Sequence, residues 1–163
     1  MKPDKALGIQ YAALPYRLQG RQLRILLITS RKSRRWVVPK GWPVNGLKPQ
    51  EAAAAEAAEE AGIIGEVASR PLGSYRYLKR LKADEAIAVQ VIVFPFLVEA
   101  QVEDWKEQGQ RSIEWFPYRR AASLVAEPGL ARLIREFGAV QTASFVVRNL
   151  RRYRSWRFGA ATG

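Results

Sequence analysis

The chain has 163 residues, 48% of them hydrophobic, which predicts one globular domain large enough to bury a core. It has no cysteine and no histidine, which excludes disulfides, cysteine nucleophiles and imidazole bases and leaves only oxygen ligands for a metal such as Mg²⁺ or Mn²⁺. The 27 Lys and Arg against 15 Asp and Glu give a net charge of +12, which predicts attraction to polyanions: nucleic acid, phosphorylated metabolites or an anionic membrane surface.

Extended patterns dominate the start of the chain. Apolar residues in 9–18 and 22–30 predict a β-hairpin around the turn Gln19-Gly20. The stretch RWVVPK at 35–40 predicts a further short strand that stops at Pro39.

A loop and a helix follow these strands. Gly41 and Gly46 bracket the loop, and the helical pattern begins at Pro49, a residue well suited to the first helical position. The helix is expected to end at Ala61, because Gly62 is a typical C-terminal stop.

The second half of the chain returns to strands and then to helices. We expect strands at 65–78, at 86–100 with Pro95 as a bulge or edge signal, and at 111–116. We expect helices near 118–126 and 128–137, followed by a further basic helix with a frayed end at 140–157. The pattern therefore predicts one α/β unit: a domain spanning 1–140, with 141–163 as a basic C-terminal helix or tail attached to it.

Three glutamates share one face of the helix predicted at 49–61. With Glu56 placed at zero, Glu60 falls at about 40° and Glu59 at about −60° around the helix axis. Like charges at this spacing repel one another and favour a compensating cation, for which a divalent ion is suited. Glu51 points away from this face and is better placed to offset the helix dipole. The competing interpretation is a solvated acidic helix face.

The spacing of these residues resembles the Nudix box, G-x5-E-x7-R-E-U-x-E-E-x-G-U, where U is aliphatic. The matching positions are Gly41, Glu56, Glu59, Glu60, Gly62 and Ile63. The stretches ITSRKSRRWVVPKG and VEDWKEQGQRSIEWFPYRRAASLV further resemble the branch that hydrolyses diphosphoinositol polyphosphates and dinucleoside polyphosphates. The resemblance covers about residues 9–126 and leaves the basic tail unexplained.

The box is degenerate in this chain. Its first glutamate falls on Leu47, its arginine on Ala55, and the aliphatic position after Glu56 is only Ala57. In the family, that arginine lies one helical turn before the glutamate that corresponds to Glu59 and helps to orient it. Its loss here predicts a less firmly held Glu59 and weaker metal binding or turnover.

The resemblance implies a fold and a reaction. The fold is a mixed β-sheet sandwiched between α-helices, with the box forming a loop–helix–loop, and the reaction is hydrolysis of a diphosphate linkage. By the same resemblance Glu56 and Glu60 are metal ligands, and Glu59 is a third ligand or the base that orients water. Gly41 would let the backbone approach the metal or phosphate. The chemistry is consistent with the composition, since metal-assisted attack by water needs no histidine.

Several cations are candidates to bind the phosphates of a substrate. They are Arg31, Arg35, Lys40, Arg76, Lys79, Lys82 and Arg111. Each one alone is more often a solvated surface charge, whereas their clustering favours a function. The identity of the general base stays open, with Glu85, Glu103 and Glu114 as further candidates.

Two other functions fit the sequence. The basic tail favours an RNA 5′-pyrophosphohydrolase, and the degenerate box favours a non-catalytic module that binds RNA or another polyanion without metal. No apolar run of about 18 residues predicts a membrane span, and no signal peptide is recognised. The absence of cysteine suits a cytoplasmic protein.

Overall fold

The structure is a computed structural model that describes the backbone of residues 7–159 and the side chains of residues 7–148. Its elements in chain order are β1 (Gly8–Gln19), β2 (Gln22–Thr29), β3 (Trp36–Val37), β4 (Lys40–Gly41), α1 (Pro49–Ala61), β5 (Ile63–Val67), β6 (Gly73–Lys82), β7 (Glu85–Gln101), β8 (Ile113–Pro117), α2 (Tyr118–Leu124) and α3 (Pro128–Gly159). The predicted hairpin and the predicted bounds of the 49–61 helix are confirmed.

The strands form one mixed sheet. Its central path runs β3-β2-β1-β7-β5, while β4 also pairs with β1, β6 with β7, and β8 with β2. The pairing of β1 with β7 is parallel, and the other pairings are antiparallel. This arrangement confirms the predicted α/β architecture with a mixed sheet.

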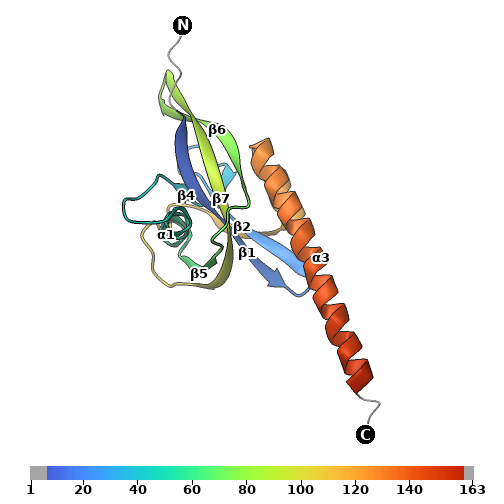
Figure 1. Cartoon of the computed structure of the whole chain (residues 1–163). Helices are drawn as coiled ribbons and strands as arrows, with labels where there is room; N and C mark the ends of the chain where they lie inside the picture. Colours follow the sequence, from blue (N-terminus) through green and yellow to red (C-terminus); the bar gives the residue numbers. More distant parts are fainter. Residues whose placement is uncertain (1–6, 160–163) are drawn as a thin grey trace.

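Alternating side chains of the strands divide the core between the two faces of the sheet. Leu26 and Ile28 of β2 pack with Phe94, Phe96 and the alanines of α1, whereas the intervening Ile25 and Leu27 pack on the side of α2 and α3. Figure 1 shows α1 and α3 on opposite sides of the strands. The sheet is therefore sandwiched between helices, as the resemblance implied.

The predicted strand at 65–78 is wrong, because this segment forms two strands. Both β5 and β6 pair with β7, and the chain leaves the sheet between them around Pro71. The same gap explains why a proline is tolerated at position 95, which lies inside the central strand β7 rather than at an edge of the sheet. Its carbonyl accepts a bond from Ala68 N–H (2.8 Å), so its missing N–H also faces the interruption between β5 and β6, where no ladder partner is required.

The predicted break between helices at 128–137 and 140–157 is also wrong. Helix α3 runs continuously through Gly138, where a Cβ atom would overlap the ring of Tyr118. This glycine therefore serves close packing between α2 and α3 instead of ending a helix. The proposed boundary at 140 falls within α3, and the division into domain and tail stays a prediction.

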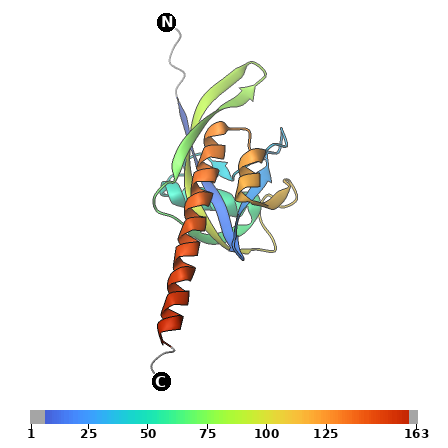
Figure 2. The ribbon, with the colours of Figure 1, turned by 90° about the vertical axis from the view of Figure 1, so that its right-hand side faces the viewer.

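Helix α3 is buried only near its start. Leu130, Ala131, Leu133, Ile134 and Phe137 belong to the core, whereas Val140, Val146 and Val147 are exposed. Its later part projects past the sheet, at the end opposite the β6–β7 hairpin (Figure 2). In the described part of the chain, no helix combines the length and apolar character needed to cross a membrane.

Candidate functional site

The alanines of α1 explain how the helix presents its glutamates. Ala52, Ala53, Ala57 and Ala61 are buried, and their small side chains let the helix backbone lie close to the sheet. Because these positions face the core, the glutamates are left on the flank of the helix. The alanine-rich sequence therefore builds the packing surface that holds the carboxylate face in place.

The two ends of α1 are fixed by local contacts. At the first turn the Lys48 backbone N–H donates to the Glu51 carboxylate (2.7 Å), which fits the prediction that Glu51 serves the helix N-terminus. At the other end Gly62 adopts a left-handed φ of 65° and its N–H donates to the Ala58 carbonyl. These contacts fix where the helix begins and ends.

Glu56 and Glu60 form a carboxylate pair whose side chains share a hydrogen bond. Burial raises the pKa of Glu60 to about 8, against the lowering effect of Arg111 and with a further rise from Glu56. Burial also raises the pKa of Glu56, although the hydrogen bond with Glu60 lowers it. Two carboxylates in contact cannot both be ionised cheaply, so the pair holds a proton near neutral pH unless a cation replaces it.

The pair fits a divalent cation with few protein ligands. A Cβ atom at residue 41 would overlap the Glu56 carboxylate, so the glycine of β4 creates the space in which that carboxylate lies. Oxygen ligands are those that Mg²⁺ and Mn²⁺ prefer. Among the described residues, however, no group of three or more acidic side chains converges as a complete metal site. The arrangement suits an ion that keeps several of its waters, as Mg²⁺ commonly does.

Glu59 is not part of this hydrogen-bonded pair, although its charge also raises the pKa of Glu56. Its carboxylate accepts a bond from Lys106 Nζ at 3.1 Å, and their side chains are 44% and 71% exposed, respectively. A cation therefore does pair with Glu59 despite Ala55, but it comes from the segment after β7, and its exposed side chain orders Glu59 only weakly. Whether Glu59 ligates a metal stays a prediction.

The segment 102–112, which we call the docking loop, lies against the C-terminal end of α1. Its Val102 N–H donates to the Gly62 carbonyl (2.8 Å), and its Glu107 N–H donates to the Glu59 carbonyl (3.0 Å). The ring of Trp105 fills the space above Gly62, where a Cβ atom would overlap it. The loop thus satisfies carbonyls that the end of the helix leaves free.

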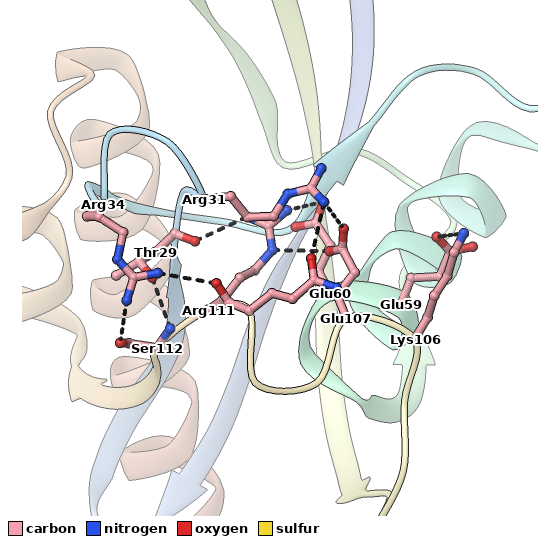
Figure 3. Close-up of polar contacts among 10 residues, drawn as sticks. Thr29, Arg31, Arg34, Glu59, Glu60, Lys106, Glu107, Arg111 and Ser112 are labelled. Atoms are coloured by element: carbon pink, nitrogen blue, oxygen red, sulfur yellow. Dashed lines mark hydrogen bonds and ion pairs between the residues drawn. The ribbon is translucent and has the colours of Figure 1, made fainter.

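Arg111 connects the docking loop with α1 and β2 (Figure 3). Its Nη2 lies 3.5 Å from Glu60 Oε1, its Nε lies 3.1 Å from Glu107 Oε2, and its Nη1 donates to the Thr29 carbonyl at 3.1 Å. Only 9% of the Arg111 side chain is exposed. This guanidinium, predicted as a phosphate ligand, is thus surrounded by protein acceptors.

Glu107 is the site residue that the sequence analysis missed. It lies between two arginines, since Arg31 Nη1 approaches its Oε1 at 3.1 Å and Arg111 approaches its Oε2 (Figure 3). The sequence offered one signal, the i, i+4 spacing of Glu107 from Arg111. This spacing does not reveal that the loop carrying both residues lies against the C-terminal end of α1. Of the bases considered instead, Glu85, Glu103 and Glu114 are all exposed.

Lys40 is a second cation close to Glu60. Burial lowers the pKa of Lys40, while the nearby Glu60 and then Glu127 raise it. Its Nζ lies 5.4 Å from the Tyr77 ring centroid, and Lys79 Nζ lies 5.5 Å from that of the exposed Trp42. These two cation–ring contacts join residues 40 and 42, next to the carboxylates, to residues 77 and 79 of β6.

The remaining predicted phosphate ligands are exposed cations. Arg31 is 57% exposed and reaches the site through Glu107, and Arg35 bonds to Ser33 in the turn before β3. Arg76 and Lys82 are exposed on β6, and Lys82 lies at the end of the hairpin. The structure thus brings Lys40, Arg111 and Arg31 to the glutamates, with Arg76 and Lys82 farther along the hairpin.

Residues 8–137 match the family model of the NUDIX domain, and the chain therefore belongs to this family. Nudix hydrolase 18, mitochondrial, of Arabidopsis thaliana is 34% identical over 110 residues, which cover 63% of this chain and 60% of that relative. The chain thus spans about 60% of the length of this curated relative.

Solved structures share the fold at low sequence identity. A C. elegans Ap4A hydrolase in a binary complex superposes with a TM-score of 0.62 at 18% identity, over 84% of this chain and 99% of that one. The E. coli dihydroneopterin triphosphate pyrophosphohydrolase gives 0.59 at 16% identity, over 83% and 99%. These likenesses confirm the NUDIX fold.

Proposed function

We propose that this domain hydrolyses a phosphoric anhydride bond in a small polyphosphorylated substrate with the help of Mg²⁺ or Mn²⁺. The observation that carries the proposal is the Glu56–Glu60 pair, in which Glu56 is half-buried and Glu60 is buried near Lys40 and Arg111. Two neighbouring carboxylates that are partly removed from water repel each other when both are ionised, which favours a compensating cation. Family membership and relatives named Nudix hydrolase support the same activity.

Glu56 and Glu60 would hold the ion, and Gly41 leaves room for them to do so. When bound, such an ion neutralises phosphate charge and lowers the pKa of coordinated water. Glu59 and Glu107 are the candidates to orient or deprotonate that water. Glu107 has the advantage that Arg111 links it to Glu60, whereas Glu59 is paired with Lys106 at the surface.

Cations around the pair would bind the phosphates. Lys40 is adjacent to the metal ligands, and the exposed Arg31 can exchange its contact with Glu107 for one with an outer phosphate. Lys79 beside Trp42 would serve the part of the substrate farther from the metal. Arg35, Arg76 and Lys82 remain proposed contributors to the surrounding positive field.

We propose a dinucleoside polyphosphate or a diphosphoinositol polyphosphate as the substrate. The resemblance of the segments before and after the box to that branch supports it, as does the fold shared with an Ap4A hydrolase. The exposed ring of Trp42 beside Lys79 favours the dinucleoside type, because an aromatic face can stack on a base. A cytoplasmic location is proposed with it.

The test is a substrate panel with the pure protein in Mg²⁺ or Mn²⁺. It contains dinucleoside polyphosphates, diphosphoinositol phosphates, ADP-ribose, NADH, nucleoside triphosphates and 5′-triphosphorylated RNA. We expect the highest kcat/KM on a dinucleoside polyphosphate. In EDTA, which removes the metal, we expect no turnover. Salt-sensitive RNA binding in EDTA without turnover of any substrate would identify a non-catalytic module instead.

The projecting part of α3 favours one second candidate, hydrolysis at the 5′ end of RNA. The sequence from 148 to 157 holds five arginines on a helix that extends away from the sheet (Figure 1). Such a helix would contact phosphates beyond the reacting group. This candidate predicts that RNA turnover, unlike turnover of a small substrate, depends on the residues after 147.

A further inference from the structure

We infer that Arg111 is a positioning residue that clamps Glu60 of α1 and Glu107 of the docking loop at a fixed separation. The inference rests on the proposed function for the use of these carboxylates, whereas the clamp itself rests on contacts within the chain. It assigns Arg111 a role other than binding substrate phosphate. In this chain, where Ala55 stands at the position of the arginine of the Nudix box, Arg111 would be the group that orders the site.

The geometry of one guanidinium carries the inference. Three of its nitrogens each contact a different segment: Nη2 meets Glu60 of α1, Nε meets Glu107 of the docking loop, and Nη1 meets the Thr29 carbonyl at the end of β2. A guanidinium is planar and rigid, so these contacts fix the directions of both carboxylates relative to the sheet. The low exposure of Arg111 keeps water from competing with them.

Neither α1 nor the exposed Lys106 of the docking loop provides an equivalent clamp. Ala55 has no polar atom, and Lys106 contacts Glu59 with a mostly exposed, flexible side chain, which orders little. The Glu107 N–H bond to the Glu59 carbonyl positions the backbone of the docking loop but not the carboxylate of Glu107. The position of that carboxylate depends on the two arginines, of which Arg111 is the buried one.

The same contacts give the two arginines different roles. Arg31 shares Glu107 with Arg111 but is 57% exposed and approaches from the turn after β2. It can therefore turn to a ligand while Arg111 keeps Glu107 in place. Arg111 would have to give up contacts with Glu60 and Thr29 in order to bind a phosphate.

The experiment compares Arg111→Ala and Arg111→Lys with Arg34→Ala as the matched control. Arg34 also donates to the docking loop, at the Gln110 carbonyl (3.2 Å), but contacts neither glutamate. Hydrogen exchange in metal-free protein reports the docking loop, and titration with Mn²⁺ followed by electron paramagnetic resonance reports the carboxylates. Steady-state kinetics on the best substrate of the panel separates kcat from KM.

We expect Arg111→Ala to raise the Kd for Mn²⁺ about 10-fold or more, in the range typical of residues that orient metal ligands. Amide exchange in the docking loop should be faster, and kcat should fall while KM stays within about threefold. Arg111→Lys should fall between the wild type and alanine, because an ammonium cannot span both carboxylates. Arg34→Ala should leave the Kd for Mn²⁺ within about twofold of the wild type.

Two outcomes would overturn the inference. A large rise in KM with unchanged Mn²⁺ affinity would make Arg111 a phosphate ligand, and a lower melting temperature with unchanged Mn²⁺ affinity and exchange would leave it a merely structural residue. If Arg111→Ala does not fold, Arg111→Lys decides between the same outcomes. If the wild-type protein hydrolyses nothing on the panel, the proposed function fails, while the exchange data still decide whether the clamp exists.

Discussion

At the scale of single residues, the site depends on what surrounds each carboxylate. Glu56 and the buried Glu60 share a hydrogen bond, Glu59 pairs with a lysine at the surface, and Glu51 caps the N-terminus of the same helix. These are four chemically identical side chains in one helix of 13 residues. Their roles differ because the rotation of the helix gives each a different environment.

Glu60→Gln should therefore act very differently from Glu51→Gln. The first change removes a charged ligand without altering its shape, so kcat should fall by orders of magnitude with little loss of fold. The second weakens a cap and should reduce the free energy of unfolding by about 0.5–1 kcal/mol with kcat unchanged. Kinetics and chemical denaturation of both variants measure this, and equal effects on kcat would contradict the assignment of faces.

The carboxylate pair also predicts how stability depends on pH without metal. Folded Glu60 keeps its proton up to its pKa of about 8, whereas the unfolded chain releases it near 4.5. Unfolding releases a proton within this window. The stability that Glu60 contributes is therefore fully present below about pH 4.5 and is lost as the pH rises through about 8. The raised pKa of Glu56 acts in the same direction.

Denaturation of the metal-free protein at several values between pH 5 and 8 measures this loss. Glu60→Gln should reduce the slope, because the amide does not titrate, and Mn²⁺ should reduce it in the wild type by replacing the proton. An unchanged slope in Glu60→Gln would show that other groups cause the dependence.

At the scale of elements, the junction of α1 with the docking loop orders the site. Gly62 ends the helix in a left-handed conformation and at the same time makes room for the ring of Trp105. Backbone bonds from Val102 and Glu107 then tie the loop to the end of the helix. Glutamates from α1 and the loop reach one site only because these two segments are joined.

Gly62→Ala tests this junction, with Gly20→Ala as its control. Both glycines have similar left-handed φ angles, 65° and 61°, but a Cβ atom meets Trp105 at Gly62 and nothing within 4 Å at Gly20. Gly20→Ala should reduce the free energy of unfolding by about 1 kcal/mol, from backbone strain alone. Gly62→Ala should lose about 1–3 kcal/mol more, since the ring must move. Equal losses in denaturant titrations would mean that the ring moves freely.

At the scale of the whole molecule, the carboxylate pair and the projecting end of α3 lie apart (Figure 1). The carboxylate pair lies on the α1 side of the sheet, whereas the core side chains of α3 pack on the other side. These core residues end at Phe137, within the part of α3 whose side chains are described.

Deletion of residues 148–163 separates the two candidate substrates. With a small polyphosphate, kcat/KM should stay within about threefold of the wild type, because the described core residues of α3 end at Phe137, before the deleted segment. With triphosphorylated RNA it should fall steeply, and the salt dependence of binding should become shallower as phosphate contacts are lost. Both are measured at two salt concentrations. Loss of RNA turnover, together with no effect of Arg31→Ala or Arg35→Ala on the small substrate, would favour the RNA function.

The sequence alone determined the elements that depend on neighbouring residues. The hairpin turn at Gly20, the helix from Pro49 to Ala61 and the common face of Glu56 and Glu60 all follow from local backbone preferences and the 3.6-residue period. The absence of histidine and cysteine likewise restricted any metal to oxygen ligands. Each of these features is settled within a few residues of the chain.

Only the tertiary structure decided which distant residues complete the site. Arg111 contacts the carbonyl of Thr29, 82 residues earlier, and Lys106 contacts Glu59, 47 residues earlier. The interruption between β5 and β6, the continuity of α3 through Gly138 and the inward direction of Arg111 depend in the same way on packing partners elsewhere in the chain. Contacts of this kind are set by strand register and loop docking, which local propensity and residue spacing do not encode.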